Sequence, residues 1–187
     1  MMETSILNRY KNRLKCYINS IDSDEVVRIA SVIKQAIDDN KTIFVVGNGG
    51  SMATAIHFAE DLMLGNKFKT KVMCLNNVSV LTAISNDYTY EQVFEKQLVN
   101  LMEKGDILIT ISCSGASPNL KRAIGHVKKL GGTTISISGF HGGDTKRKSD
   151  YSIYARTEVG DYEATEDLHY IICHMIARLI KEMDYED

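Results

Sequence analysis

The sequence predicts an α/β protein in which a parallel β-sheet is covered by helices on both faces. Short apolar runs of strand length alternate along the chain with segments whose apolar residues recur at helical spacing. Strands that alternate with helices form parallel sheets, and helices cover both faces because such strands are apolar throughout. A chain of 187 residues suits one domain with a sizeable core, so we expect a single domain over residues 1–187.

The predicted strands are runs rich in β-branched and other apolar residues. They span residues 42–46, 71–75, 106–112, 133–138 and 151–155. Glycine-rich segments end two of these strands, at Gly47–Ser51 and at Gly139–Gly143. The sequence therefore predicts five strands.

The predicted helices occupy the segments before, between and after the strands. Two lie in the first forty residues, and Ser23 is the expected N-cap of the second. The others span residues 52–64, 91–102, 118–130 and 162–183, with a short one from a cap at Ser79 to Asn86-Asp87. Pro118 opens its helix at a position that favours proline.

Composition excludes several classes of function. The net charge of −2 indicates no surface for nucleic acid or membrane, and we expect neither as a partner. The longest apolar runs are too short to span a bilayer, and no secretory apolar core follows Met1, so we expect a cytoplasmic protein. The four cysteines form no Cys-x-x-Cys pair, which favours reduced thiols over a zinc ribbon or redox motif.

Two loops of small residues follow predicted strands and precede predicted helices, at Gly47–Ser51 and Ser112–Ser117. Both are therefore expected at the carboxyl edge of the sheet, where parallel sheets bind ligands. Glycine lets backbone N–H groups approach a ligand closely, and a helix N-terminus favours an anion. Neither a P-loop nor a dinucleotide pattern is present in the first loop, and a plain strand-to-helix turn is the alternative.

The second loop carries three hydroxyls, on Ser112, Ser114 and Ser117. Hydroxyls and free backbone donors form a phosphate cradle without lysine or arginine, although serine also caps helices for structural reasons. Cys113 belongs to the same loop, and its place near a helix N-terminus allows a lowered pKa. We expect its thiol to pack, because no base is evident nearby in the sequence.

Titratable residues on two predicted helices are candidates for chemistry. His57, Glu60 and Asp61 lie three and four residues apart, on neighbouring positions of one helix face. A histidine and a carboxylate at this spacing hold a divalent metal or act in acid–base catalysis; an ordinary surface ion pair is the alternative. On the final helix Glu166 and His174 are two turns apart and can face one cavity, although a buried structural histidine is the alternative for His174.

These segments, in this order and spacing, resemble the SIS (sugar isomerase) family, and within it the phosphoheptose isomerases. The resemblance covers nearly the whole chain. It is carried by residues 47–51 with His57–Glu60, then by 80–87, 104–117, 137–143 and 166–174.

The resemblance implies a flavodoxin-like fold, with three α/β/α layers and a five-stranded parallel sheet. It implies a homotetramer with active sites at subunit interfaces, in which the helices of residues 1–40 serve oligomerisation. It also implies conversion of sedoheptulose 7-phosphate to a manno-heptose 7-phosphate, for lipopolysaccharide or capsule, with no organic cofactor.

The resemblance also implies roles for particular residues. The positions that match phosphate-binding hydroxyls are Ser51, Ser112, Ser114 and Ser117, with Cys113 in the same loop. The positions that match sugar-binding residues are Asn48, Gly49, Gly50, Asn86 and Asp87.

Four further positions match a site that binds Zn²⁺ in several members of the family. They are His57, Asp61, Glu166 and His174, with Asp61 as the catalytic base, His174 as the acid and Glu166 as the alternative base. Asp61 stands where the family has Glu and Glu166 where it has Gln, and no arginine follows Asp61 closely. The shorter side chain of Asp61 reaches about 1.5 Å less far.

Two other functions stay open at this point. One relative of the same fold binds the bacterial replication initiator without catalysis, so a non-catalytic phosphosugar-binding or initiator-binding protein is one alternative. An isomerase acting on a different phosphosugar is the other. The presence of both histidines and two carboxylates favours an enzyme.

Overall fold

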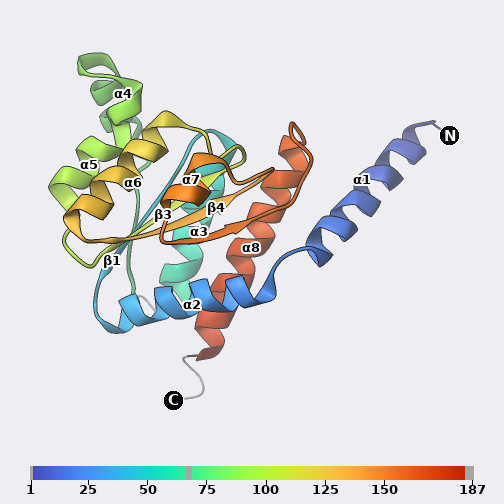
Figure 1. Cartoon of the computed structure of the whole chain (residues 1–187), viewed down its shortest axis with the longest axis horizontal. Helices are drawn as coiled ribbons and strands as arrows, with labels where there is room; N and C mark the ends of the chain where they lie inside the picture. The colour runs from blue at the N-terminus through green and yellow to red at the C-terminus, as the bar shows by residue number, and fades with distance from the viewer. Residues whose placement is uncertain (1, 66–68, 184–187) are drawn as a thin grey trace.

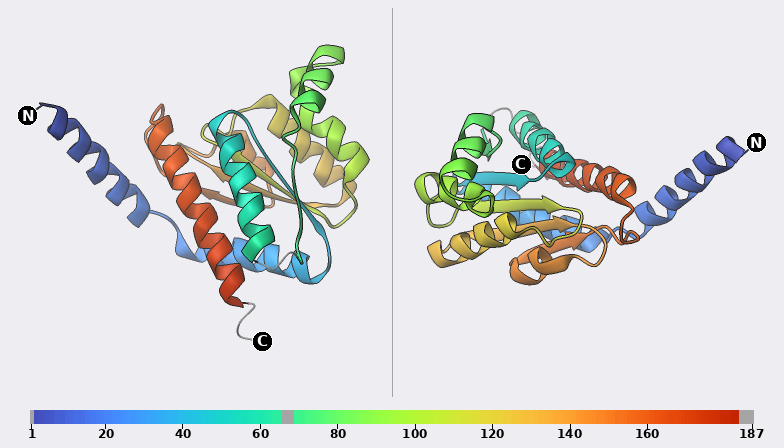
Figure 2. Two further views of the ribbon diagram at one scale, coloured as in Figure 1. Left: turned by 180° about the vertical axis from the view of Figure 1, so that it is seen from behind. Right: turned by 90° about the horizontal axis from the view of Figure 1, so that it is seen from above.

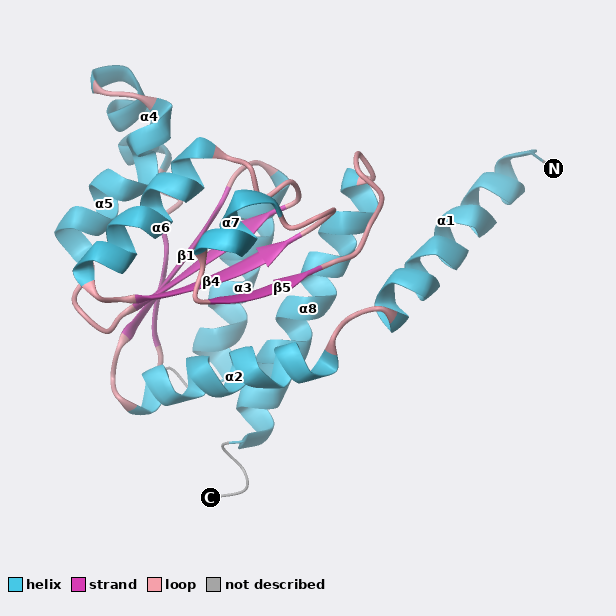
Figure 3. Ribbon diagram, viewed as in Figure 1, coloured by secondary structure: helices cyan, strands magenta, loops and turns pink. Residues whose placement is uncertain are grey.

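The computed structural model describes residues 2–65 and 69–183. A five-stranded sheet forms its centre, and all pairs of neighbouring strands are parallel (Figure 1, Figure 3). The strands are β1 (Thr42–Gly47), β2 (Lys71–Cys74), β3 (Ile107–Ser112), β4 (Thr133–Ser138) and β5 (Tyr151–Tyr154). Their spatial order is β2-β1-β3-β4-β5, so the predicted flavodoxin-like sheet is confirmed.

The sheet has a topological switch point between β1 and β3. From β1 the chain crosses to β2 on one side, and it then returns to continue through β3 on the other. Gly47 at the end of β1 pairs with Ile111 of β3, so the loops that follow these two strands start side by side. Parallel sheets bind ligands at such a point.

Helices cover both faces of the sheet (Figure 2). One face packs against α2 (Ser23–Asp38), α3 (Gly50–Gly65) and α8 (Tyr162–Met183). The other face packs against α5 (Val93–Leu101) and α6 (Pro118–Leu130), while the short α7 (Gly143–Lys148) lies beside β4. Side chains of β1 alternate between the two cores: Ile43 and Val45 enter the first, and Phe44 and Val46 the second.

Two helical segments follow β2 and lead to α5. They are α4 (Val78–Asp87) and the 3₁₀ turn η1 (Tyr90–Gln92). Among the described residues, no side chain of α4 is buried. This segment therefore stands at the edge of the molecule, above α5 and α6 in Figure 1.

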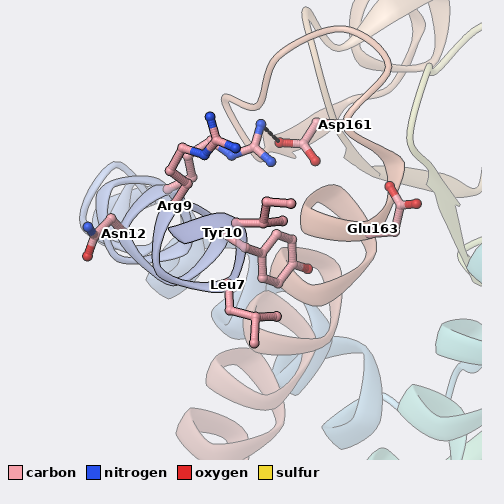
Figure 4. A pocket seen from close by; sticks show the side chains of 8 residues that line it. Leu7, Arg9, Tyr10, Asn12, Asp161 and Glu163 are labelled. Carbon is pink, nitrogen blue, oxygen red and sulfur yellow. Dashed lines mark ion pairs between the residues drawn. The ribbon is translucent and has the colours of Figure 1, made fainter. Parts of the chain in front are cut away.

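The first helix, α1 (Met2–Asn19), projects away from the rest of the chain (Figure 1). Polar links tie it to the body, since the hydroxyl of Tyr10 donates to Asp167 at 2.5 Å and Arg13 lies 3.2 Å from Asp161, and Leu14 and Tyr17 near its end pack against the core. The Asp167 carboxylate raises the pKa of Tyr10 to about 12. A cavity of about 880 Å³ lies between α1 and the start of α8 (Figure 4).

Two predicted N-caps are wrong, and one helix was not predicted. Asp22, not Ser23, caps α2, because its carboxylate accepts from the N–H groups of Asp24 and Glu25. Asn77, not Ser79, caps α4 by accepting from the N–H of Val80 at 3.2 Å. The α7 turn follows directly on a glycine-rich break and lacks apolar periodicity, so the sequence pattern shows only the break.

Within the described residues, no helix combines the length and the apolar character needed to cross a membrane.

Candidate active site

The two glycine- and serine-rich loops meet at the switch point, and their backbones require glycine. A Cβ on Gly47 would lie 2.5 Å from the carbonyl oxygen of Ser51. Gly115 has a φ of +61°, and a Cβ there would lie 2.1 Å from the carbonyl oxygen of Gly142. The loops are therefore packed directly against backbone, which fixes the directions of their N–H groups.

The serine hydroxyls of the second loop take part in local hydrogen bonds as acceptors. Ser112 Oγ accepts from the N–H of Gly115 at 3.1 Å, and Ser114 Oγ accepts from the N–H of Ala116 at 3.2 Å. Ser117 is the N-cap residue of α6, and its side chain makes no capping hydrogen bond. Each hydroxyl keeps its own hydrogen for donation. The loop thus offers donors to an anion at the start of a helix.

Ser51 of the first loop and Cys113 of the second loop lie next to each other. Both side chains are buried, and Ser51 Oγ lies 4.0 Å from Cys113 Sγ. Burial raises the pKa of Cys113 to about 11, and the charge of Glu166 acts in the same direction. The thiol is therefore protonated at neutral pH, which fits the packing role predicted from the sequence.

Helices α3 and α8 bring two histidines and a carboxylate together. Nε2 of His57 lies 3.1 Å from Nε2 of His174. Oδ2 of Asp61 lies 3.6 Å from each of these nitrogens. His57 and Asp61 are one turn apart on α3, while His174 comes from α8, so the packing of the two helices creates the cluster.

This cluster fits a divalent metal. Zn²⁺ binds imidazole nitrogen at about 2.0–2.1 Å in tetrahedral sites, which separates two ligand atoms by about 3.3 Å. The three observed separations lie around this value, and the three side chains form a possible metal-binding group. Oδ2 of Asp61 is buried without a hydrogen-bond partner among the described residues, as expected for an atom that ligates an ion. Two histidines and one carboxylate match a common set of zinc ligands.

The carboxylate of Glu166 does not join this group of three. It lies against Gly50, where a Cβ would be 2.3 Å from Oε1 of Glu166. Gly50 is the first residue of α3, so a negative charge sits over the N-terminus of that helix, where it is stabilised. Glu166 lies on α8, two helical turns before His174, and its carboxylate is therefore beside the first loop and not in the cluster.

The remaining predicted sugar-binding residues divide between two places. Gly49 and Asn48 lie in the first loop, and Gly49 adopts a φ of +55° with nothing within 4 Å of a Cβ. Asn86 and Asp87 lie at the end of α4, where both are exposed and Asn86 Nδ2 donates to Asp87 Oδ1 at 2.9 Å. Asn48 and Gly49 therefore belong to the first loop itself, whereas Asn86 and Asp87 lie at the exposed end of α4.

Sequence patterns missed two residues that bond to Asn48, namely Asn119 and Tyr90. An asparagine directly after Ser117-Pro118 was the available signal for Asn119, because a buried polar residue at a helix start needs a partner. No sequence pattern pointed to Tyr90, because it is 42 residues from Asn48 and only the fold brings its hydroxyl to the Asn48 side chain.

A cavity of about 340 Å³ adjoins the cluster. It is lined by Asp61, Leu64, Gly65, His174, Ala177, Arg178 and Lys181. Arg178 is one turn after His174 on α8, and its guanidinium pairs with Glu182 at 2.7 Å. Arg178 and Lys181 of α8 therefore line the same cavity as Asp61.

The structure combines a parallel sheet, hydroxyl-rich loops at its switch point and a His–Asp–His cluster between two helices. These features are expected of an α/β protein that binds a phosphorylated sugar. The chain belongs to the SIS domain family, whose model matches residues 9–139. A probable phosphoheptose isomerase of Thermoplasma acidophilum is 33% identical over 87% of this chain and 91% of its own length. A phosphoheptose isomerase of Nitratiruptor is 38% identical over 79% of this chain and 80% of its own length.

The fold similarity to solved structures extends over nearly the whole chain. A phosphoheptose isomerase from Neisseria gonorrhoeae superimposes with a TM-score of 0.87 and 26% identity, covering 97% of this chain and all of the other. One from Francisella tularensis gives a TM-score of 0.88 at 23% identity, over the same share of each chain.

Proposed function

We propose that this protein is a phosphoheptose isomerase that converts sedoheptulose 7-phosphate to D-glycero-D-manno-heptose 7-phosphate. The observation that carries the proposal is the cluster of His57, Asp61 and His174, together with the serine loops at the switch point. The names of the relatives give the same substrate class. A non-catalytic phosphosugar-binding protein would not need this set of titratable groups.

The serine loops hold the phosphate in this mechanism. Ser51, Ser112, Ser114 and Ser117 supply hydroxyl donors, and the N-terminus of α6 supplies a favourable dipole. Phosphate is remote from the reacting carbons, so its binding energy serves to position them. Asn48, Gly49, Gly50, Asn86 and Asp87 hold the sugar chain between the phosphate and the cluster.

Asp61 acts as the general base and His174 as the general acid. Isomerisation requires removal of the proton next to the carbonyl and protonation of the developing enediolate oxygen. The Asp61 carboxylate and the His174 imidazole are 3.6 Å apart and border one cavity, which supports the proposal that they act on the same carbon–oxygen unit.

Glu166 is the alternative base. Its contact with Gly50 supports this role, because it puts a carboxylate beside the loop that holds the sugar. The variant Glu166→Gln separates the two possibilities. If Glu166 is the base, the variant loses turnover, and if Asp61 is the base, the variant keeps turnover.

As the alternative to acid–base chemistry by these side chains alone, we propose that His57, Asp61 and His174 would hold one divalent metal, Zn²⁺; a His174 that ligates the metal through Nε2 would not act as the acid. Glu166 is the proposed fourth ligand, and reaching the cluster requires its side chain to leave Gly50. A metal held there would supply Lewis-acid polarisation of the substrate's carbonyl oxygen. The protein residues orient the sugar and carry the protons.

The proposal extends to assembly and pathway. The enzyme works as a homotetramer in the cytoplasm and supplies heptose for lipopolysaccharide or capsule. The exposed apolar residues of α1, which include Ile6 and Leu7, support a role of the N-terminal helices in assembly.

The test is incubation of the purified protein with sedoheptulose 7-phosphate, with and without added Zn²⁺, followed by NMR. The proposal expects signals of a manno-heptose 7-phosphate. Turnover of another ketose phosphate in a substrate panel, without turnover of the heptulose, would assign the protein to a different phosphosugar. Tight binding of phosphosugars without any turnover would favour the binding-protein alternative.

A further inference from the structure

The side chain of Asn48 forms a reciprocal amide pair with Asn119. Nδ2 of Asn48 donates to Oδ1 of Asn119 at 3.0 Å, and Nδ2 of Asn119 donates to Oδ1 of Asn48 at 2.9 Å. The orientation of Asn119 is fixed by the backbone, because the N–H of Leu120 donates to its Oδ1 at 2.9 Å. Since that oxygen is an acceptor, the atom of Asn48 facing it has to be the nitrogen.

A third group completes the arrangement. The hydroxyl of Tyr90 donates to Oδ1 of Asn48 at 2.8 Å. This oxygen now accepts two hydrogen bonds, which uses both of its lone pairs. One N–H of Asn48 stays without a partner among the described residues. Asn48 therefore meets a ligand only as a hydrogen-bond donor.

The same three side chains connect three separate segments of the site. Asn48 belongs to the loop after β1, and Asn119 is the second residue of α6, directly after the serine loop. Tyr90 belongs to η1, which follows Asn86 and Asp87 in the chain. Asn119 is 2% exposed, so its amide has no access to competing water.

We propose that Asn119 and Tyr90 are positioning residues that lock the amide of Asn48 as a single donor to an oxygen of the bound sugar phosphate. They act through Asn48, without touching the substrate. A locked donor selects an oxygen acceptor at that point of the sugar chain, a hydroxyl or phosphate oxygen, and disfavours a ligand that presents a donor alone. The inference rests on the proposed function, because the ligand is the phosphosugar of that reaction.

The main test is Tyr90→Phe, with Tyr88→Phe as the matched control. Tyr88 is two residues away and 57% exposed, and its ring lies over Lys96, a contact that phenylalanine keeps. Loss of one neutral hydrogen bond corresponds to about a three- to tenfold weaker interaction. We expect the KM and Kd for sedoheptulose 7-phosphate to rise about three- to tenfold in Tyr90→Phe, with kcat within about twofold and an unchanged melting temperature. Tyr88→Phe should match the parent.

Asn119→Asp is the second variant. It keeps the acceptor for Leu120 and for Asn48 Nδ2 but opposes a carboxylate oxygen to Oδ1 of Asn48. An acidic residue in the first turn of α6 suits the helix dipole, so the fold keeps a favourable term while the amide pair is broken. We expect the Kd to rise more than in Tyr90→Phe, by about tenfold or more.

The outcomes separate this inference from the proposed function. Equal Kd values for the parent, Tyr90→Phe and Asn119→Asp overturn the inference and leave the proposed function intact if the parent turns over the sugar. A parent that binds sedoheptulose 7-phosphate without converting it contradicts the proposed function, while the Kd values of the variants still decide the inference. A parent that does not bind the sugar overturns both.

Discussion

Asp61 has the most demanding surroundings of the candidate residues. One oxygen of its carboxylate is buried, has no hydrogen-bond donor among the described residues and lies 3.6 Å from two imidazole nitrogens. A buried carboxylate oxygen without a hydrogen-bond donor is costly, and a bound ion or a proton-transfer partner would offset that cost. The physical chemistry of this one atom therefore favours a functional cluster over a surface ion pair.

Asp61→Asn and His174→Ala should each reduce kcat by about a hundredfold or more, because each removes a proton-transfer group. The Kd for sedoheptulose 7-phosphate, measured by calorimetry, should change little, since the serine loops hold the phosphate. Asp38→Asn, at the exposed end of α2, is the control and should keep parental kcat. Parental turnover in Asp61→Asn would exclude Asp61 as the base.

His169 is a second titratable residue of α8, and it is completely buried. Burial lowers its pKa to about 4, and the backbone of Ser138 opposes that shift only in part. The unfolded chain binds a proton at this histidine below its ordinary pKa of 6.5, whereas the folded chain resists it down to about 4. Stability contributed by the neutral ring is present above pH 6.5 and is lost as the pH falls toward 4.

We therefore expect the free energy of unfolding to fall by about 3 kcal/mol between pH 6.5 and 4 through His169. In urea titrations at several pH values, His169→Gln should lose most of that pH dependence, whatever its starting stability. His141→Gln, at an exposed position, should keep it. An identical slope in His169→Gln and the parent would show that the ring is already protonated in the fold.

At the scale of elements, the sequence predicted the sheet well because each strand is a short apolar run bounded by glycine or polar residues. The loops after β1 and β3 were also predictable, since a parallel sheet brings its carboxyl ends to one edge. The pairing of His57 and Asp61 with His174 was not predictable from spacing, because it depends on how α3 packs on α8. The family resemblance supplied it.

Glu166 illustrates the same limit. It lies eight residues before His174, which is about 12 Å along a helix axis, so the two side chains start far apart. Spacing alone cannot say whether the long side chain of Glu166 reaches toward the cluster or toward the loops. In the structure it contacts Gly50.

The loop backbone gives a prediction with a matched pair of glycines. Gly115 has a positive φ and faces the backbone of Gly142, whereas Gly125 lies inside α6 with nothing within 4 Å of a Cβ. Gly115→Ala should destabilise the protein by about 1–3 kcal/mol and weaken phosphosugar binding. Gly125→Ala should stabilise it by about 0.4–1 kcal/mol and leave binding unchanged. Thermal melting and calorimetry measure both, and an equal effect of the two changes would contradict the proposed loop geometry.

At the scale of the whole molecule, the exposed apolar surface of α1 is not covered by the rest of the same chain. Its residues Ile6, Leu7 and Ile18 are 49%, 60% and 40% exposed, and the helix projects from the body (Figure 1). Most of the stability of a helix in a protein comes from packing of its apolar face, and α1 leaves these apolar residues largely uncovered. A second copy of the chain would cover this surface in the proposed tetramer.

Light scattering should therefore give the parent a mass of about four times the 20.9 kDa of one chain. Leu7→Glu puts a charge into the exposed apolar surface and should shift the protein to smaller species. Lys15→Glu, an exposed charge reversal on the same helix, is the control and should leave the mass nearer to that of the parent. A monomeric parent at micromolar concentration would contradict the proposed assembly.

The most direct test of the proposed isomerase is NMR of sedoheptulose 7-phosphate incubated with the parent protein in D₂O, with and without Zn²⁺. A working base removes the proton next to the carbonyl and exchanges it with solvent, so the parent should yield a manno-heptose 7-phosphate that carries deuterium at C2. Asp61→Asn should yield neither product nor exchange. A parent that binds the sugar but shows no product and no deuterium at any sugar carbon, under either condition, would contradict the isomerase function.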